Sequence, residues 1–214
     1  TWNISIDHLR KESEMTYHIL HVLAYVGNQH IPFRLIQEAA RRRKGLDTGT
    51  HRPDNSTARQ RDSDSQRSSD SGSDDKSSDS GDEEDDLEEA IARLREFSFL
   101  HVRTLNVPKQ EHVFDIHQLV QEAAMHRLQN QVDATAGSEA YFSRAAFHVA
   151  YALFPHSQRD TWSQCEQYLL HAQKAGDWAG LHKGEIDVAN LLDRVSFYLY
   201  ERGRWREREP VDKT

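Results

Sequence analysis

The chain has 214 residues, enough for one or two compact units, and it begins with Thr1, so we expect a fragment or a processed chain. No apolar run reaches the about 20 residues that cross a bilayer, and no charged-then-apolar leader opens the chain. A single cysteine, Cys165, excludes an internal disulfide and a cysteine zinc cluster. The formal charge is -8, with the acidic residues concentrated in one segment. We expect a cytoplasmic, reducing setting.

Residues 1–44 show helical periodicity. Three successive segments each place their apolar residues on one helical face. These residues are Trp2, Ile6 and Leu9 in the first segment, Met15, Ile19, Val22, Leu23 and Val26 in the second, and Leu35, Ile36, Ala39 and Ala40 in the third. Pro32 suits the first position of the third helix. The basic run 41–44 suits its end, where cations favour the negative end of the helix dipole. Contact with nucleic acid is the alternative for this run.

Residues 45–86 are rich in serine and aspartate and hold almost no apolar side chains. Such a stretch cannot offset the about 1–2 kcal/mol of entropy that ordering each residue costs. We predict a disordered acidic insertion within a folded domain. Ser71 and Ser80 are phosphorylation candidates, because Asp74 and Glu83 follow them by three positions. The alternative is a tolerated, solvated insertion.

Residues 87–131 predict a helix at 87–97 and then a β-hairpin. Leu100 and Val102 alternate with His101 and Arg103, a polar turn follows, and residues 112–114 form a short second strand. Consecutive helices, then a hairpin and then a further helix follow the order of a winged helix-turn-helix unit. We therefore predict a winged-helix domain built from residues 1–44 and 87–131.

The helix that closes this unit has strong start signals. Asp115 is a good N-cap and Gln118, three residues on, completes a pair like a capping box. Phe114 and Leu119 occupy the positions of a hydrophobic staple. His117 should then lie in the first turn, where unpaired backbone N–H groups and the helix dipole favour an anion.

Residues 137–214 are predicted to be entirely helical. Apolar stripes occur at Phe142, Ala145, Ala146, Val149, Ala150 and Leu153, at Trp162, Cys165, Leu169 and Ala172, and at Val188, Leu192, Val195 and Leu199. Pro155 ends the first stripe and Gly203 the third. This is typical of antiparallel helical hairpins in a repeat. The fold class is thus mainly α: a winged helix with a short β-hairpin, then truncated helical pairs.

The last stretch, "LLDRVSFYLYERGRW", resembles the first helix of a tetratricopeptide repeat. Its matching positions are Leu192, Val195, Ser196, Leu199, Gly203 and Trp205. Leu199 replaces the usual aromatic residue, and Arg208 stands where the second helix of the repeat has alanine.

Longer stretches resemble the winged-helix segment of fungal NB-ARC proteins, a group of STAND signalling ATPases. They are "TWNISIDHLRKESEMTYHILHVLAYVGNQHIPFRLI", "LEEAIARLREFSFLHV" and "FDIHQLVQEAAMHRL". "CEQYLLHAQ" is similar to the lead-in to the repeats of that family. The resemblance covers nearly all of the chain outside the insertion. It implies a regulatory segment whose helical repeats bind protein partners and whose winged helix acts on an upstream nucleotide-binding domain that holds ADP or ATP.

In that family a Met-His-Asp-like motif ends the winged helix, and its histidine approaches the β-phosphate of ADP in the resting state. The matching residues are Ile116, His117 and Gln118. Only His117 carries over as a nucleotide-sensing residue, because Gln118 lacks the carboxylate of the aspartate.

Other chemistry is not indicated. The sequence has no G-x-x-x-x-G-K-[ST] loop and no G-x-S-x-G elbow, so we expect no catalysis and no cofactor in this chain. Among thirteen histidines, His18 and His21 lie three apart on a helix without an evident third ligand, and we expect no metal site. Cys165 should be a buried thiol, and Asp187 and Asp193 should meet water. The alternatives to the NB-ARC hypothesis are a winged-helix nucleic-acid binder, with residues 32–44 as its recognition helix, and a protein-binding scaffold without nucleotide control.

Overall fold

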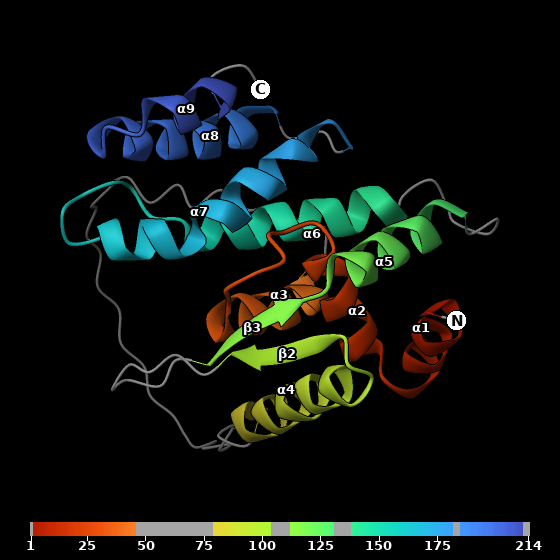
Figure 1. Cartoon of the computed structure of the whole chain (residues 1–214). Coiled ribbons are helices and arrows are strands. Elements are labelled where there is room, and N and C mark those ends of the chain that lie inside the picture. The colour runs from red at the N-terminus through yellow and green to blue at the C-terminus, as the bar shows by residue number, and fades with distance from the viewer. Residues whose placement is uncertain (1, 46–78, 104–111, 131–137, 182–184, 212–214) are drawn as a thin grey trace, which may run out of the picture.

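The computed structural model describes residues 2–45, 79–103, 112–130, 138–181 and 185–211. Within these ranges the chain is mainly helical with a three-stranded antiparallel sheet (Figure 1). The helices are α1 (Trp2–Glu12), α2 (Glu14–Leu23), α3 (Phe33–Gly45), α4 (Asp79–Glu96), α5 (Gln118–Asn130), α6 (Ser138–Leu153), α7 (Trp162–Asp177), η1 (Ala179–Leu181), α8 (Glu185–Glu201) and α9 (Trp205–Val211), and the strands are β1 (Ile31–Pro32), β2 (Leu100–Arg103) and β3 (Val113–Ile116).

Helix α2 is the central element and is buried on all sides. Residues 16–23 are all buried, and the helix contacts α1, α3, α4, α5 and α6. Ser13 caps its start, since the Ser13 hydroxyl accepts a hydrogen bond from the Thr16 N–H at 3.2 Å. A helix enclosed in this way must be largely apolar all round. The apolar periodicity predicted only one buried face for this helix. In the structure His18 and His21, which lie outside that face, are buried as well.

The predicted hairpin is confirmed, and it gains a third strand. The strand order is β1-β3-β2, with β2 and β1 both antiparallel to β3. Pro32, predicted as the first helical residue, pairs with Val113 instead. Helix α3 therefore begins at Phe33, whose N–H donates to the His112 carbonyl at 3.1 Å. Proline fits this place because β1 is an edge strand that needs few donors.

The helices on either side of the insertion predicted at 45–86 extend into that range. Helix α3 includes Gly45, and α4 begins at Asp79, eight residues before the predicted Leu87. The added residues of α4 are mostly acidic, and acidic residues near a helix start are favoured by its dipole. Helix α4 packs on α2 and β2, so the blocks on both sides of residues 46–78 belong to one body.

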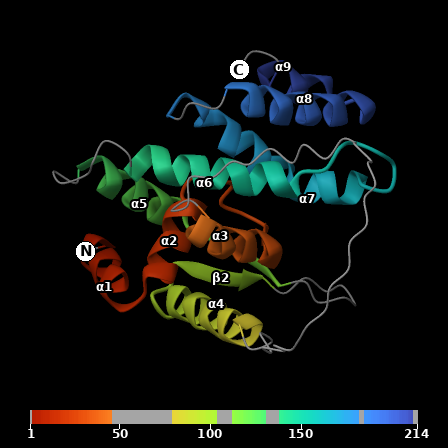
Figure 2. The same ribbon diagram turned by 180° about the vertical axis from the view of Figure 1, so that it is seen from behind.

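The four helices α6 to α9 pack in sequence, each against the next. Figures 1 and 2 show α8 and α9 in the layer farthest from the sheet, with α6 and α7 between. Helix α6 also packs on α2 and α3, and one apolar cluster runs through both parts of the molecule. Gly203 ends α8 with a positive φ of 67°, and the Arg204 N–H returns to the Leu199 carbonyl at 2.9 Å.

No helix among the described residues is both long and apolar enough to cross a membrane.

Candidate functional site

His117 is an exposed residue between the last residue of β3 and the first residue of α5. Its carbonyl accepts hydrogen bonds from the N–H groups of Val120 at 2.8 Å and Gln121 at 3.3 Å. Its ring Nδ1 accepts the Leu119 N–H at 3.2 Å. His117 is therefore the N-cap of α5. The predicted first-turn position was wrong by one residue, because the chain stays extended through Ile116.

Asp115, the predicted N-cap, lies in β3 and serves another purpose. Its Oδ1 accepts the His30 backbone N–H at 2.8 Å, and its Oδ2 lies 2.9 Å from the Arg103 Nε. The Arg103 Nη1 also lies 3.1 Å from the His30 Nε2. Both carboxylate oxygens thus fasten β3 to β2 and to the segment that precedes β1.

The predicted capping box and staple are likewise wrong. The Gln118 side chain donates to Glu122 one turn along at 2.9 Å, and so does not reach back to residue 115. Phe114 is buried, whereas Leu119 is 56% exposed, so these two side chains form no buried pair across the helix start. The apolar face of α5 consists of Val120, Ala124 and Leu128, which are buried together with Ile116 at the end of β3.

The capping bonds define what this helix start offers to a ligand. The N–H groups of residues 119–121 are all bonded to His117 itself, so the open set of amides expected for an anion is already occupied. An Nδ1 that accepts a hydrogen bond carries no proton, and the neutral ring then holds its proton on Nε2. The donor at this site is therefore the His117 Nε2–H, on an exposed side chain.

Gln121, which the sequence did not single out, ties this helix to the end of α2. Its buried Nε2 donates to the carbonyls of Leu23 at 2.7 Å and Val26 at 3.0 Å. The available signal was helical spacing. Position 121 lies one residue after Val120 and three before Ala124, which places it beside the apolar face of α5.

Among the residues that the structure describes, three histidines are buried: His18, His21 and His171. Burial lowers the pKa of each from 6.5 to about 4. The His21 Nδ1 donates to the Tyr17 carbonyl at 2.8 Å, and the His171 Nε2 lies 3.3 Å from the His30 carbonyl. His18 and His21 do not converge on a metal site, and no cluster of three or more potential ligands occurs in the described ranges.

The remaining predicted residues are spread over the molecule. Ser71 lies outside the described residues, and Ser80 lies at the start of α4 rather than in an unstructured insertion. Cys165 is buried, as predicted, and burial raises the pKa of its thiol. Asp193 is exposed and Asp187 is partly exposed, which agrees with contact to water. Of these residues, the ones that the structure describes do not join His117 in a site.

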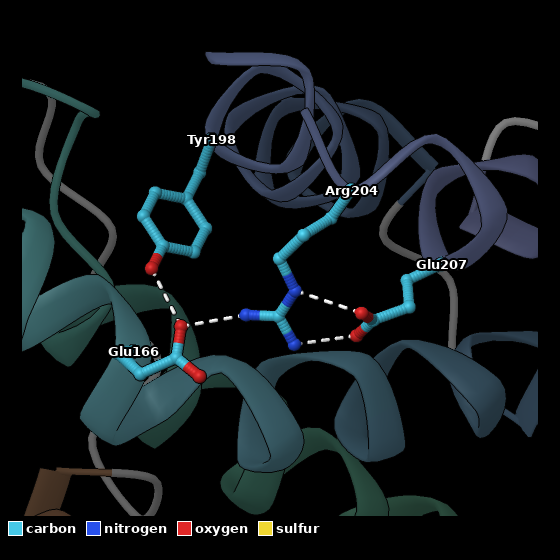
Figure 3. A network of polar contacts seen from close by, with 4 residues as sticks. All are labelled: Glu166, Tyr198, Arg204 and Glu207. Carbon is cyan, nitrogen blue, oxygen red and sulfur yellow. Dashed lines mark hydrogen bonds and ion pairs between the residues drawn. The ribbon is translucent and has the colours of Figure 1, made fainter. Parts of the chain in front are cut away.

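A polar network joins α7, α8 and α9 (Figure 3). The Tyr198 Oη and the Arg204 Nη1 both donate to the Glu166 Oε2, each at 2.6 Å. The Arg204 Nε and Nη2 donate to the two oxygens of Glu207. These bonds raise the pKa of the Arg204 guanidinium and lower that of the Glu207 carboxyl. Burial and the bond to Glu166 raise the pKa of Tyr198 to about 12.

The positions that resemble a tetratricopeptide repeat have specific contacts. Ser196 is buried, and its hydroxyl accepts a hydrogen bond from the Arg208 Nε at 2.8 Å. Arg208, where the pattern has alanine, thus reaches across to α8. Trp205 packs edge-on against Tyr200, with ring centroids 4.9 Å apart, and stays 57% exposed.

Comparisons of the chain with protein-family models, curated proteins and solved structures return no match.

Proposed function

We propose that the chain is a non-catalytic regulatory and interaction segment of an NB-ARC-type signalling ATPase of the cytoplasm. The winged-helix part, residues 1–44 and 87–131, would control a nucleotide switch in a domain that precedes it and binds ADP or ATP. The helical pairs, residues 137–214, would bind protein partners. Activation would allow homo-oligomers to form.

The observation that carries this proposal is the presentation of the His117 ring. Ile116 is buried and anchors the end of β3, while the next residue is exposed and caps α5. Capping uses Nδ1 and leaves Nε2–H as the donor, which is the form of histidine that can donate to a phosphate oxygen. Gln118 bonds to Glu122, so it adds no contact beside the ring.

The mechanism would be a two-state equilibrium. With ADP bound, the His117 Nε2–H would donate to the β-phosphate and keep the winged helix against the nucleotide-binding domain. ATP would favour the other state only to the extent that it binds that state more tightly. The acceptor role of Nδ1 keeps the ring in the required tautomer through this cycle.

The helical pairs support the interaction role. Large apolar side chains are exposed on their outer helices, including Ile186, Phe197, Tyr200 and Trp205. Aromatic residues of this kind are enriched where proteins bind one another.

The arrangement of α3 does not favour the nucleic-acid alternative. Helix α3 lies between α2 and α6, and its exposed Arg34 and Arg41 line a groove shared with Glu84 and Asp86 of α4. The nearby carboxylates would repel the phosphates that a recognition helix must approach. In a salt-dependent gel shift with duplex DNA, we expect no specific complex.

The proposal is tested by ADP retention in the longer protein that contains the nucleotide-binding domain. We expect His117→Ala to release ADP about 10- to 100-fold faster, the factor for one hydrogen bond to a charged group. His117→Ser should do the same although serine still caps a helix, so the loss cannot be assigned to an unfolded α5. His126→Ala, an exposed histidine at the other end of α5, is the control. Unchanged release in both His117 variants would contradict the proposal.

A further inference from the structure

We propose that residues 27–31, between α2 and α3, form a strut that sets the position of His117 according to the position of α7. The strut is a property of this chain alone. Its regulatory meaning, that binding to the helical pairs reaches the nucleotide contact, rests on the proposed function of His117.

One edge of the strut is bonded to the residues immediately before His117. Ile31 pairs with Phe114 in the sheet. The Ile116 N–H donates to the Asn28 carbonyl at 2.9 Å, and the His30 N–H donates to the Asp115 carboxylate at 2.8 Å. The end of β3 therefore moves with this segment.

The other edge of the strut lies against α7. The buried His171 Nε2 lies 3.3 Å from the His30 carbonyl and is placed to donate to it. At Gly27 the approach is closer still. A Cβ added there would lie 2.6 Å from the Leu170 Cγ and 3.1 Å from the His171 Nδ1. The close approach of this segment to α7 therefore requires glycine at position 27, because glycine has no Cβ.

Helix α5 is joined to the same segment from its own side. A groove of about 350 Å³ is lined by both α5 and α7, and Val26, Gly27 and Asn28 line it as well. Gln121, in the first turn of α5, donates to the Val26 carbonyl next to the strut. In Figure 1 the segment between α2 and α3 passes beside α6 and α7 before it descends to the level of the sheet.

The strut has little freedom to absorb a displacement of α7. His30 has a φ of 55°, a region in which a residue with a side chain has few alternatives, and it is held at both its N–H and its carbonyl. A shift of α7 is thus passed on through hydrogen bonds that end one residue before His117. Chains of hydrogen bonds and packed side chains of this kind can carry coupling between two sites.

The test compares the nuclear magnetic resonance signals of Gly27→Ala, made in the 214-residue chain, with those of the wild type. The added methyl group must displace Leu170 or α7, so we expect shifts of the His117 ring and the Leu119 amide. Exchange of the Leu119 amide should become about fivefold faster as its bond to the His117 Nδ1 weakens, the factor that corresponds to about 1 kcal/mol. Gly180→Ala is the matched control, since nothing lies within 4 Å of a Cβ at that position.

Two further variants separate coupling from simple damage. Leu170→Ala added to Gly27→Ala makes room for the methyl group and should return the His117 and Leu119 signals toward wild type. His171→Phe should shift them without any change at residue 27, and His171→Gln should shift them less, because its amide can still donate to the His30 carbonyl. If all shifts stay within α7 and residues 27–31, the strut is refuted. ADP release plays no part here, so a failure of the nucleotide hypothesis would be seen separately.

Discussion

At the scale of single residues, Gln121 has the clearest energetic role. Its amide is the donor for two buried carbonyls, those of Leu23 and Val26. We expect Gln121→Leu to lower the free energy of unfolding by about 2 kcal/mol, because both carbonyls would stay buried without that donor. Gln118→Leu, which removes only an exposed bond to Glu122, should change it by less than about 0.5 kcal/mol. Urea denaturation of both variants decides this, and equal effects would contradict the assigned role.

Only part of the candidate site at His117 could be predicted from its neighbours in the sequence. The position of His117 at an exposed helix start follows from the apolar spacing of Ile116, Val120 and Ala124. Its role as the cap does not, because Asp115 is the better capping residue. Asp115 is unavailable to α5 because it binds His30, 85 positions earlier in the chain, and Arg103 on the neighbouring strand. Partners so distant in sequence leave no local signal.

At the scale of elements, the attachment of α9 depends on Arg204. This guanidinium joins Glu166 of α7 to Glu207 of α9. We expect Arg204→Ala to destabilise the docking of α9 by about 1 kcal/mol, a modest value because both carboxylates are about half exposed and screened by solvent. Hydrogen exchange of α9 amides should become about fivefold faster, while α6 stays unchanged. Arg206→Ala, at an exposed arginine of α9, is the control, and equal acceleration in it would rule out the network as the cause.

Two elements show the limits of periodicity. Strand β1 has only Ile31 and Pro32, too short for an alternating pattern, and it exists because β3 offers it a partner. The first residues of α4 lie in a segment whose composition is typical of disordered chains. The helix extends into this segment because Leu87, Ala90 and Leu94 already hold its later turns against the core, and adding residues to an existing helix is easier than starting one. Long apolar stripes, in contrast, predicted α3, α6 and α8 correctly.

At the scale of the whole molecule, the buried histidines lie where the two parts of the chain meet. His18 and His21 of α2 pack against Phe142 of α6, and His171 of α7 contacts the His30 carbonyl. Helical stripes in each part could be predicted from the sequence. The packing of the two parts against each other could not be predicted, because histidines on a helix give no sign in the sequence that they will be buried against an apolar helix. The junction thus encloses rings that must remain neutral.

This junction makes stability depend on pH in a defined range. The pKa of each of the three rings falls from 6.5 to about 4 on folding, mainly through burial, and the charges that act on the pair in α2 are cationic, from Arg43 on His18 and from Arg127 and Arg10 on His21. Between these values the unfolded chain binds more protons than the folded one. The contribution of these rings to the free energy of unfolding is therefore fully present above about pH 6.5. It is lost as the pH drops towards 4, by at most about 4 kcal/mol per pH unit for three protons.

Urea denaturation at pH 7 and pH 5.5 measures this loss in a range where most carboxylates remain ionised. Replacement of one buried ring by a neutral aromatic, His21→Phe, should remove about one third of the difference between the two pH values, since one of three proton-binding groups is gone. His126→Phe, at an exposed ring on α5, should leave the difference unchanged. If His21→Phe kept the full pH dependence, the loss would have to come from groups outside the junction, and the enclosed rings would not be the acid-sensitive part of this fold.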